Sequence, residues 1–159
     1  MDGTGPASPD DLDRLEAVID DYLALRLSED PAVAAVERGE PGQRRWYVRI
    51  LGEAKDVYSV WLTLGQRTLH YETYFMPAPE ENAEAVYRQL LVRNAKLYGL
   101  AFSIGQEDAV FLAGQLGNES VDAAAVDRVL GSIVAAVELC FQPAIRLAFA
   151  SKFAPRDSS

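Results

Sequence analysis

The fold is decided by the stretch RWYVRILGEAKDVYSVWLTLGQRTLHYETYFM, residues 45–76, in which apolar and polar side chains alternate over three segments. The apolar positions are Trp46, Val48 and Ile50, then Tyr58, Val60, Leu62 and Leu64, then Leu69, Tyr71, Thr73 and Phe75. A period of two is typical of a strand with one buried face. Short turns at Gly52–Asp56 and Gly65–Gln66 join the segments, so the stretch predicts an antiparallel meander with one apolar face.

Helical signals precede this meander. Ser8-Pro9-Asp10-Asp11 offers a hydroxyl for the N-cap, a proline for the first helical position and acids for the first turn. Apolar residues then recur at helical spacing, which predicts a helix from Ser8 to about Leu27. Asp30-Pro31 opens a second, shorter helical segment, Ala32–Arg38, which Gly39 should end.

The second half of the chain returns to helical spacing after Pro77 and Pro79. Pro79-Glu80-Glu81 should start a helix that runs to about Leu97, with Gly99 as its C-cap. Two short strands follow, at Leu100–Ile104 and Ala109–Gln115. The second is apolar on both faces, so we expect it to be central or covered by a neighbouring subunit.

A long helical pattern closes the chain. Asn118 or Ser120 can cap it, and Pro143 should kink or divide it just before that residue. The resulting fold class is α+β, an antiparallel sheet of about five strands with helices packed on one side, in the order α-β-β-β-α-β-β-α. We expect one domain over residues 9–153, with residues 1–8 and 154–159 disordered.

The composition narrows the possible partners. The 159 residues carry a net charge of -9, which disfavours binding to nucleic acid or to an anionic membrane surface. The start of the chain lacks the basic and apolar segments of a signal peptide, and no apolar run is long enough to span a bilayer. We therefore expect a cytoplasmic protein. The one cysteine, Cys140, excludes an intramolecular disulfide and lies in an apolar helical stretch, where a thiol usually behaves as a small hydrophobe.

No pattern of catalytic or metal-binding residues is found. His70 is the one histidine, and no glycine-flanked serine elbow or phosphate-binding loop accompanies it. Gly114–Gly117 lacks the third glycine, the lysine and the βαβ context of a nucleotide site, so we interpret it as a turn. The acids of the first helix, such as the pair Asp20-Asp21, are typical of a solvated helix face. We expect no enzyme activity, no cofactor and no metal.

Two features could bind a partner or a ligand. Asn94 falls at a position where helical periodicity demands burial, so its amide bonds either to nearby backbone or to a ligand. The strand alternation places Tyr47, Arg49, Trp61 and Tyr74 on the face opposite the apolar one, together with His70 and Glu72. Aromatic residues beside an arginine are typical of binding hot spots, and they are equally consistent with cross-strand pairs that only stabilise the sheet.

The segment Tyr87–Leu97 (YRQLLVRNAKL), followed by Phe102-Ser103-Ile104 and the strand Val110–Gln115, resembles the YbjN family, labelled as bacterial sensory transduction regulators. The resemblance covers about Trp46 to Phe149. It implies a fold similar to type III secretion chaperones, which are small, acidic and typically dimeric and which hold partner polypeptides without ATP. The chain departs from that pattern in the predicted extra turn at Ala32–Arg38 and in the helix interrupted at Pro143.

The residues and the resemblance together predict a non-catalytic protein-binding module, chaperone-like or regulatory, that acts as a homodimer. Its partner would bind over Tyr47, Trp61 and Tyr74, with Arg49 available for carboxylates. The alternative is a small-molecule sensor with a pocket between the sheet and the helices near Asn94.

Overall fold

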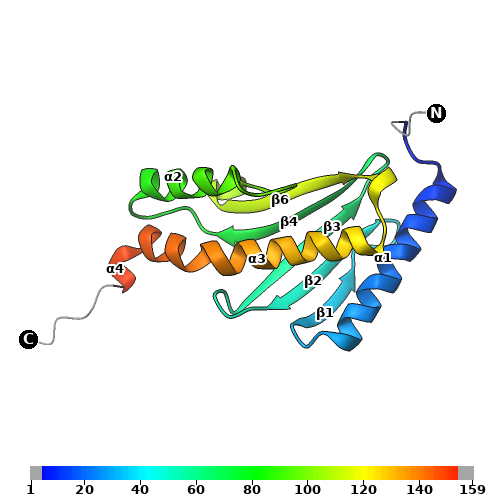
Figure 1. The fold of residues 1–159 in the computed structure, drawn as a ribbon, viewed down its shortest axis with the longest axis horizontal. Coiled ribbons are helices and arrows are strands. Elements are labelled where there is room, and N and C mark those ends of the chain that lie inside the picture. Colours follow the sequence, from blue (N-terminus) through cyan, green and yellow to red (C-terminus); the bar gives the residue numbers. More distant parts are fainter. Residues whose placement is uncertain (1–4, 154–159) are drawn as a thin grey trace, which may run out of the picture.

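Six antiparallel strands form one sheet in the order β1-β2-β3-β4-β6-β5 (Figure 1). The structure is a computed structural model, and it describes residues 5–153. The strands are β1 (Val33–Arg38), β2 (Arg45–Leu51), β3 (Val57–Leu64), β4 (Thr68–Met76), β5 (Ala101–Ile104) and β6 (Val110–Gly117). The helices are α1 (Pro9–Glu29), α2 (Ala83–Asn94), α3 (Ala123–Ala148) and α4 (Ala150–Phe153), with short 3-10 turns at Gln106–Asp108 and Asn118–Ser120.

The predicted α+β class and the packing of helices on one side of the sheet are confirmed, with six strands in place of about five. Most of the segments predicted to be disordered, residues 1–4 and 154–159, lie outside the described residues. The N-cap of α1 is Ser8, as predicted, and its hydroxyl oxygen accepts a hydrogen bond from the backbone N–H of Asp11.

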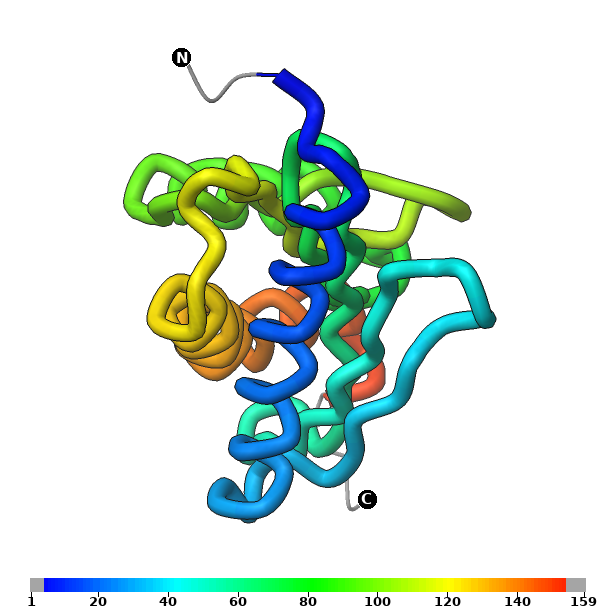
Figure 2. The backbone as a smooth tube through the Cα atoms, turned by 90° about the vertical axis from the view of Figure 1, so that its right-hand side faces the viewer, coloured from blue at the N-terminus to red at the C-terminus, as the bar shows by residue number. Residues whose placement is uncertain are grey.

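The core lies between one face of the sheet and helices α1 and α3. In the view of Figure 2 these two helices lie to the left of the hairpin formed by β1 and β2. The predicted apolar positions of the meander face them, and Trp46, Val60 and Leu62 have no exposed surface. From α3, Val126 and Ile133 are likewise fully buried. Burying such side chains contributes about 1.5–3 kcal/mol each, so this face fixes the register of the strands.

The prediction of a short helix at Ala32–Arg38 is wrong, because this segment is the edge strand β1. It pairs with β2 through Val36 opposite Val48 and Arg38 opposite Trp46, with a bulge between Val33 and Ala35. A short run of alanine and valine has no decisive intrinsic preference, and pairing with a neighbouring strand outweighs it. The extra strand accounts for the difference in strand number.

The sequence predicts a kink or a division of the last helix at Pro143, and the division does not occur, since α3 continues through Pro143 to Ala148. Pro143 and the residue one turn before it, Leu139, are both exposed. The carbonyl group that loses its helical donor therefore faces water, which lowers the cost of the proline. The N-cap of α3 is Asp122, whose carboxylate accepts a hydrogen bond from the N–H of Ala125. Neither Asn118 nor Ser120, the predicted residues, is the N-cap.

The second helix is shorter than predicted. α2 begins at Ala83, after Asn82 at its N-cap, and ends at Asn94, so Gly99 belongs to the following turn with φ +72°. The strand that is apolar on both faces, β6, lies between β4 and β5 and is therefore not an edge. Its Leu112 side chain is fully buried on the helix side.

Candidate functional site

The four predicted partner-binding residues lie on one face of the sheet, opposite the helices. Tyr47 and Arg49 belong to β2, Trp61 to β3 and Tyr74 to β4. The relative exposed surface is 37% for Trp61 and 42% for Tyr74, whereas their sequence neighbours on the other face are buried. We call this surface, defined by Tyr47, Arg49, Trp61, Tyr74 and Phe111, the open face.

Strand register brings the first two aromatic residues of the open face together. Tyr47 lies directly opposite Trp61, which in turn lies opposite Glu72. The rings of Tyr47 and Trp61 meet edge to face, with 6.1 Å between their centroids and an interplanar angle of 80°. This geometry stabilises the sheet by a few tenths of a kcal/mol to about 1 kcal/mol, and it leaves part of the indole surface exposed.

A second aromatic pair adjoins the first, and the sequence reasoning missed one of its members. Phe111 of β6 lies opposite Tyr74, and their rings are perpendicular at 5.6 Å. The signal was present in the doubly apolar pattern of β6, which places Phe111 and Ala113 on the face opposite Leu112. Partial burial, together with the carboxylate of Glu107, raises the pKa of Tyr74 above its ordinary value, so its hydroxyl stays neutral at physiological pH.

Lys55, in the loop between β2 and β3, was also missed. Its Nζ donates hydrogen bonds of 2.8 Å to the backbone carbonyls of both Tyr74 and Phe75, and it lies 5.1 Å from the centroid of the Tyr74 ring. These carbonyls are available because the pairing of β3 with β4 ends at Val60 and Thr73. The ammonium group thus replaces backbone donors where the two strands separate.

The loop that carries Lys55 is held by α3. The Glu138 carboxylate accepts from the backbone N–H groups of Glu53 and Ala54, and the Gln142 amide donates to the carbonyl of Ala54. Burial lowers the pKa of Lys55 to about 8, because water that would solvate the ammonium group is displaced. The position of Tyr74 on the open face is therefore linked through Lys55 to the helix layer.

The open face carries charges of both signs. Arg49 is exposed, and within residues 5–153 it forms no ion pair. His70 Nε2 lies 3.7 Å from Glu72 Oε2, and the Arg45 guanidinium donates to the Thr63 hydroxyl at 3.1 Å. A free guanidinium beside exposed aromatic rings can bind a carboxylate and an apolar side chain of the same partner.

Asn94 serves a structural purpose. Its amide donates to the carbonyl of Phe102 at 3.1 Å, and its carbonyl oxygen accepts from the Phe102 N–H at 2.7 Å. This is the bond to backbone that the sequence left open as one of two interpretations. Since both functional groups of the amide are occupied by β5, Asn94 gives no support to a ligand pocket at this junction.

The remaining polar candidates are paired or buried. The acids on one side of α1 form ion pairs with two arginines, Arg44 with Asp13 at 2.7 Å and Arg38 with Asp20 at 3.1 Å. Cys140 is buried, and burial raises the pKa of its thiol, which disfavours the reactive thiolate. In the described part of the chain, no group of three or more His, Cys, Asp and Glu residues could hold a metal ion.

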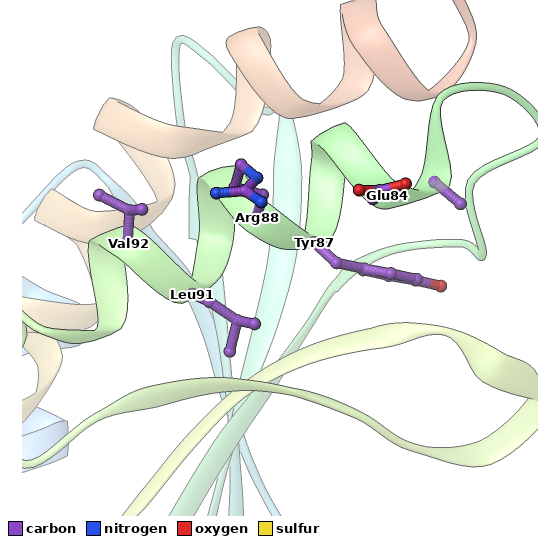
Figure 3. A pocket seen from close by; sticks show the side chains of 6 residues that line it. Glu84, Tyr87, Arg88, Leu91 and Val92 are labelled. Carbon is purple, nitrogen blue, oxygen red and sulfur yellow. The ribbon is translucent and has the colours of Figure 1, made fainter.

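A hollow lies on the outer surface of α2, away from the pocket that the sequence suggested near Asn94. It is lined by Ala83, Glu84, Tyr87, Arg88, Leu91 and Val92. Figure 3 shows Tyr87 and Leu91 directed away from α3. Leu91 is exposed, although its spacing in the sequence fits the buried positions of this helix. No helix within residues 5–153 combines the length and the apolar character needed to span a membrane.

The fold is that of type III secretion chaperones. The structure aligns with the Yersinia pestis chaperone SycH, solved with a fragment of YscM2, with a TM-score of 0.52 and 15% identity over 79% of this chain and 98% of SycH. It aligns with a chain of the ExsC–ExsE complex with a TM-score of 0.57 and 18% identity over 81% of this chain and 94% of that one. The alignment with a chain of the HopA1–SchA chaperone–effector complex has a TM-score of 0.56 and 11% identity, and it covers 87% of this chain and 99% of that one.

The chain belongs to the YbjN family, whose model, described as "Putative bacterial sensory transduction regulator", matches residues 11–146. Its relatives include the uncharacterized proteins Rv0487 of Mycobacterium tuberculosis (strain ATCC 25618 / H37Rv) and ML2442 of Mycobacterium leprae (strain TN). The first is 38% identical over 104 residues, 65% of this chain and 57% of the relative. The second is 34% identical over 110 residues, which are 69% of this chain and 60% of the relative. The match therefore spans less than two thirds of either relative.

Proposed function

We propose that the chain is a non-catalytic protein-binding module, chaperone-like or regulatory, which binds an extended segment of a partner protein on the open face. It acts in the cytoplasm as a homodimer. The observation that carries the proposal is the exposed indole of Trp61, placed between Tyr47 and Glu72 on a sheet face that no helix of the described chain covers.

The open face has the chemistry that concentrates binding energy in few residues. Tryptophan, tyrosine and arginine dominate hot spots: the two aromatic side chains bury a large area with only two rotatable bonds each, and the planar guanidinium of arginine offers several hydrogen-bond donors. Trp61 and Tyr74 supply that area, and Arg49 supplies a charged donor with no competing carboxylate among the described residues. A partner segment with apolar side chains and a carboxylate would fit this arrangement.

The comparisons support the proposal at the level of fold. The similar structures are described as chaperones in complex with other proteins: SycH with a YscM2 fragment, and SchA with the effector HopA1. Identities of 15% and 11% show a shared fold alone, so the proposed partner and binding surface are inferred from the residues of this chain.

The test is replacement of Trp61 by alanine, with Leu139→Ala as the matched control. Leu139 is an exposed residue of α3 on the opposite layer. In a pull-down from native cytoplasm, the Trp61→Ala variant should lose the partner that wild type captures. Loss of a residue that contributes over 1.4 kcal/mol to binding lowers the affinity by about tenfold or more. The control variant should retain that partner.

Two results would count against the proposal. Equal capture by Trp61→Ala and wild type would show that the aromatic pairs only stabilise the sheet. A large loss of Tm in Trp61→Ala would show that the indole acts as part of the core. The solution mass is measured alongside, and a monomer at micromolar concentration would contradict the homodimer.

A further inference from the structure

The open face lies over the middle of the sheet, where the backbone groups of the strands already have partners. β3 pairs with β2 along one edge and with β4 along the other, and β4 also pairs with β6. Strand addition needs a free edge, so a partner segment that lies over Trp61 gains no backbone hydrogen bonds from these strands. Such a segment must bind through the side chains of the open face.

Three aromatic side chains of the open face carry polar donors without a partner. The indole N–H of Trp61 and the hydroxyl groups of Tyr47 and Tyr74 form no hydrogen bond within residues 5–153. The other indole of the chain, that of the buried Trp46, donates to Asp20 at 2.7 Å. The open face therefore offers hydrogen-bond donors to a partner that brings acceptors.

A proline-rich segment brings acceptors without bringing donors. Proline has no backbone N–H, and a run of prolines in the polyproline II conformation presents its carbonyl groups to the surroundings with no internal hydrogen bonds. A β-strand laid on the same face would bring as many N–H groups as carbonyl groups, and those turned toward the sheet would lose water without gaining a backbone partner. The donors of the open face thus match a proline-rich segment better than a strand.

The two aromatic pairs of the open face are spaced for such a segment. Both pairs are edge to face, Tyr47 with Trp61 at 80° and Tyr74 with Phe111 at 90°. They lie two strands apart and are offset by two residues along the strands, which corresponds to about 12 Å. About four residues of a polyproline II helix, at about 3.1 Å each, cover this distance. A proline ring can pack at each pair, because its polarised C–H groups are attracted to the negative face of an aromatic ring.

Charge selects what flanks the prolines. Arg49 lies two residues from Tyr47 on the same face, and its cross-strand neighbours, Ala35 and Ser59, are small and uncharged. Its guanidinium forms no ion pair within residues 5–153. Because the whole chain has a net charge of -9, it would repel a segment that is acidic throughout, whereas a single carboxylate at Arg49 would be attracted.

We infer that the open face binds a proline-rich segment in the polyproline II conformation, with an acidic residue at the end that reaches Arg49. The inference rests on the proposed function and names the chemistry of its partner. The proline rings pack at the two aromatic pairs, and the indole N–H of Trp61 donates to a carbonyl group of the segment.

The first test uses synthetic peptides, with the two tryptophans of the chain as reporters. A blocked peptide of about ten prolines with glutamate at both ends is titrated into the isotope-labelled full chain. The indole N–H signal of Trp61 should shift as the peptide binds, whereas that of Trp46, buried and bonded to Asp20, should stay in place. Two control peptides keep the glutamates and replace the prolines by alanine, or by alternating valine and threonine. Each control should bind at least tenfold more weakly.

The second test uses variants of the open face. Trp61→Phe keeps an aromatic ring and removes the indole donor, so it should weaken the proline peptide severalfold, whereas Leu139→Ala on α3 should not change its affinity. Replacing both glutamates of the peptide by glutamine should weaken binding severalfold to wild type and not to Arg49→Gln, because that variant has no cation to pair with the carboxylate. The Tm of each variant is measured to confirm that the chain is folded.

Equal binding of the proline and alanine peptides to wild type would overturn the inference. So would tighter binding of the valine–threonine peptide, or the absence of any shift of the Trp61 signal at millimolar proline peptide. These comparisons use the wild-type chain and do not depend on how a variant folds. Failure of the inference is distinguishable from failure of the proposed function: if the proline peptide does not bind while Trp61→Ala loses its captured partner, the open face binds a segment of other chemistry.

Discussion

At the scale of single residues, Lys55 connects the helix layer with the open face. Its ammonium group fills the place where β3 and β4 separate, and it lies against the ring of Tyr74. A lysine buried in this way carries an electrostatic cost that an apolar side chain would not, which makes its contribution dependent on pH.

The stability of the protein should therefore rise with pH above about 8. Burial lowers the pKa of Lys55 to about 8, whereas in the unfolded chain it is 10.5. Between these values the unfolded chain holds a proton that the folded protein has released, so the free energy of unfolding increases with pH. Allowing for partial exposure, the increase should be about 1–2 kcal/mol across that range.

Urea unfolding at pH 7.5, 8.5 and 9.5 measures this slope for wild type and for Lys55→Met. The difference between the two removes the contributions of the tyrosines, which titrate higher. The free energy of wild type relative to Lys55→Met should rise over this range, whereas Lys152→Met, at an exposed lysine, should show no such trend. A pH-independent difference would mean that the Lys55 amine titrates at its ordinary value.

At the scale of elements, the acidic side chains of α1 bind it to the sheet through ion pairs and a hydrogen bond. Asp20 accepts a hydrogen bond of 2.7 Å from the Trp46 indole N–H and pairs with Arg38, whose guanidinium lies 4.7 Å from the centroid of the Trp46 ring. Arg44 pairs with both Asp13 and Glu16 in the same way. A row that looks like a solvated helix face in the sequence is thus a contact between elements.

Two substitutions at Asp20 should separate its two contacts. Asp20→Ala removes both the ion pair and the acceptor for the buried Trp46 indole, so we expect a loss of about 1–2 kcal/mol. Asp20→Asn keeps an acceptor and loses only the exposed pair, so its loss should stay below about 1 kcal/mol. Chemical denaturation monitored by tryptophan fluorescence measures both, and equal losses would show that the indole bond contributes little.

The sequence predicted those elements in which the pattern and the packing agree. The meander of β2, β3 and β4 follows from strict alternation, because one face of each strand is buried. β1 was misread as a helix, since its pairing with Val48 and Trp46 is a long-range contact that local preference does not contain. The continuity of α3 through Pro143 could not be predicted, because the cost of a proline depends on whether the freed carbonyl faces water, which requires knowledge of the exposed side of α3.

The same reasoning explains which parts of the open face were found. Tyr47, Trp61 and Tyr74 were placed by alternation along single strands. Lys55 was missed because its contacts depend on where β3 and β4 cease to pair, and the sequence contains no local sign of that point. The exposure of Leu91 could not be predicted, because the neighbouring Leu90 has the same residue type and is buried, and both fit a helical apolar spacing.

At the scale of the whole molecule, the open face and the helix layer lie on opposite sides of the sheet. Helices α1 and α3 pack on the buried face, and Tyr47, Trp61 and Tyr74 lie on the other. A partner segment that binds on the open face therefore displaces no helix, so each chain should bind a segment by itself.

This arrangement predicts a complex with one partner segment bound per chain, two per dimer. Isothermal titration of the dimer with the captured partner segment should give a stoichiometry of one per chain, and Leu139→Asp, on the helix side, should keep both that value and the affinity within about twofold. The geometry leads to this result because every residue of the open face belongs to one chain. A stoichiometry of one segment per dimer would instead require the segment to contact both copies, and would place the binding surface across the two-fold axis.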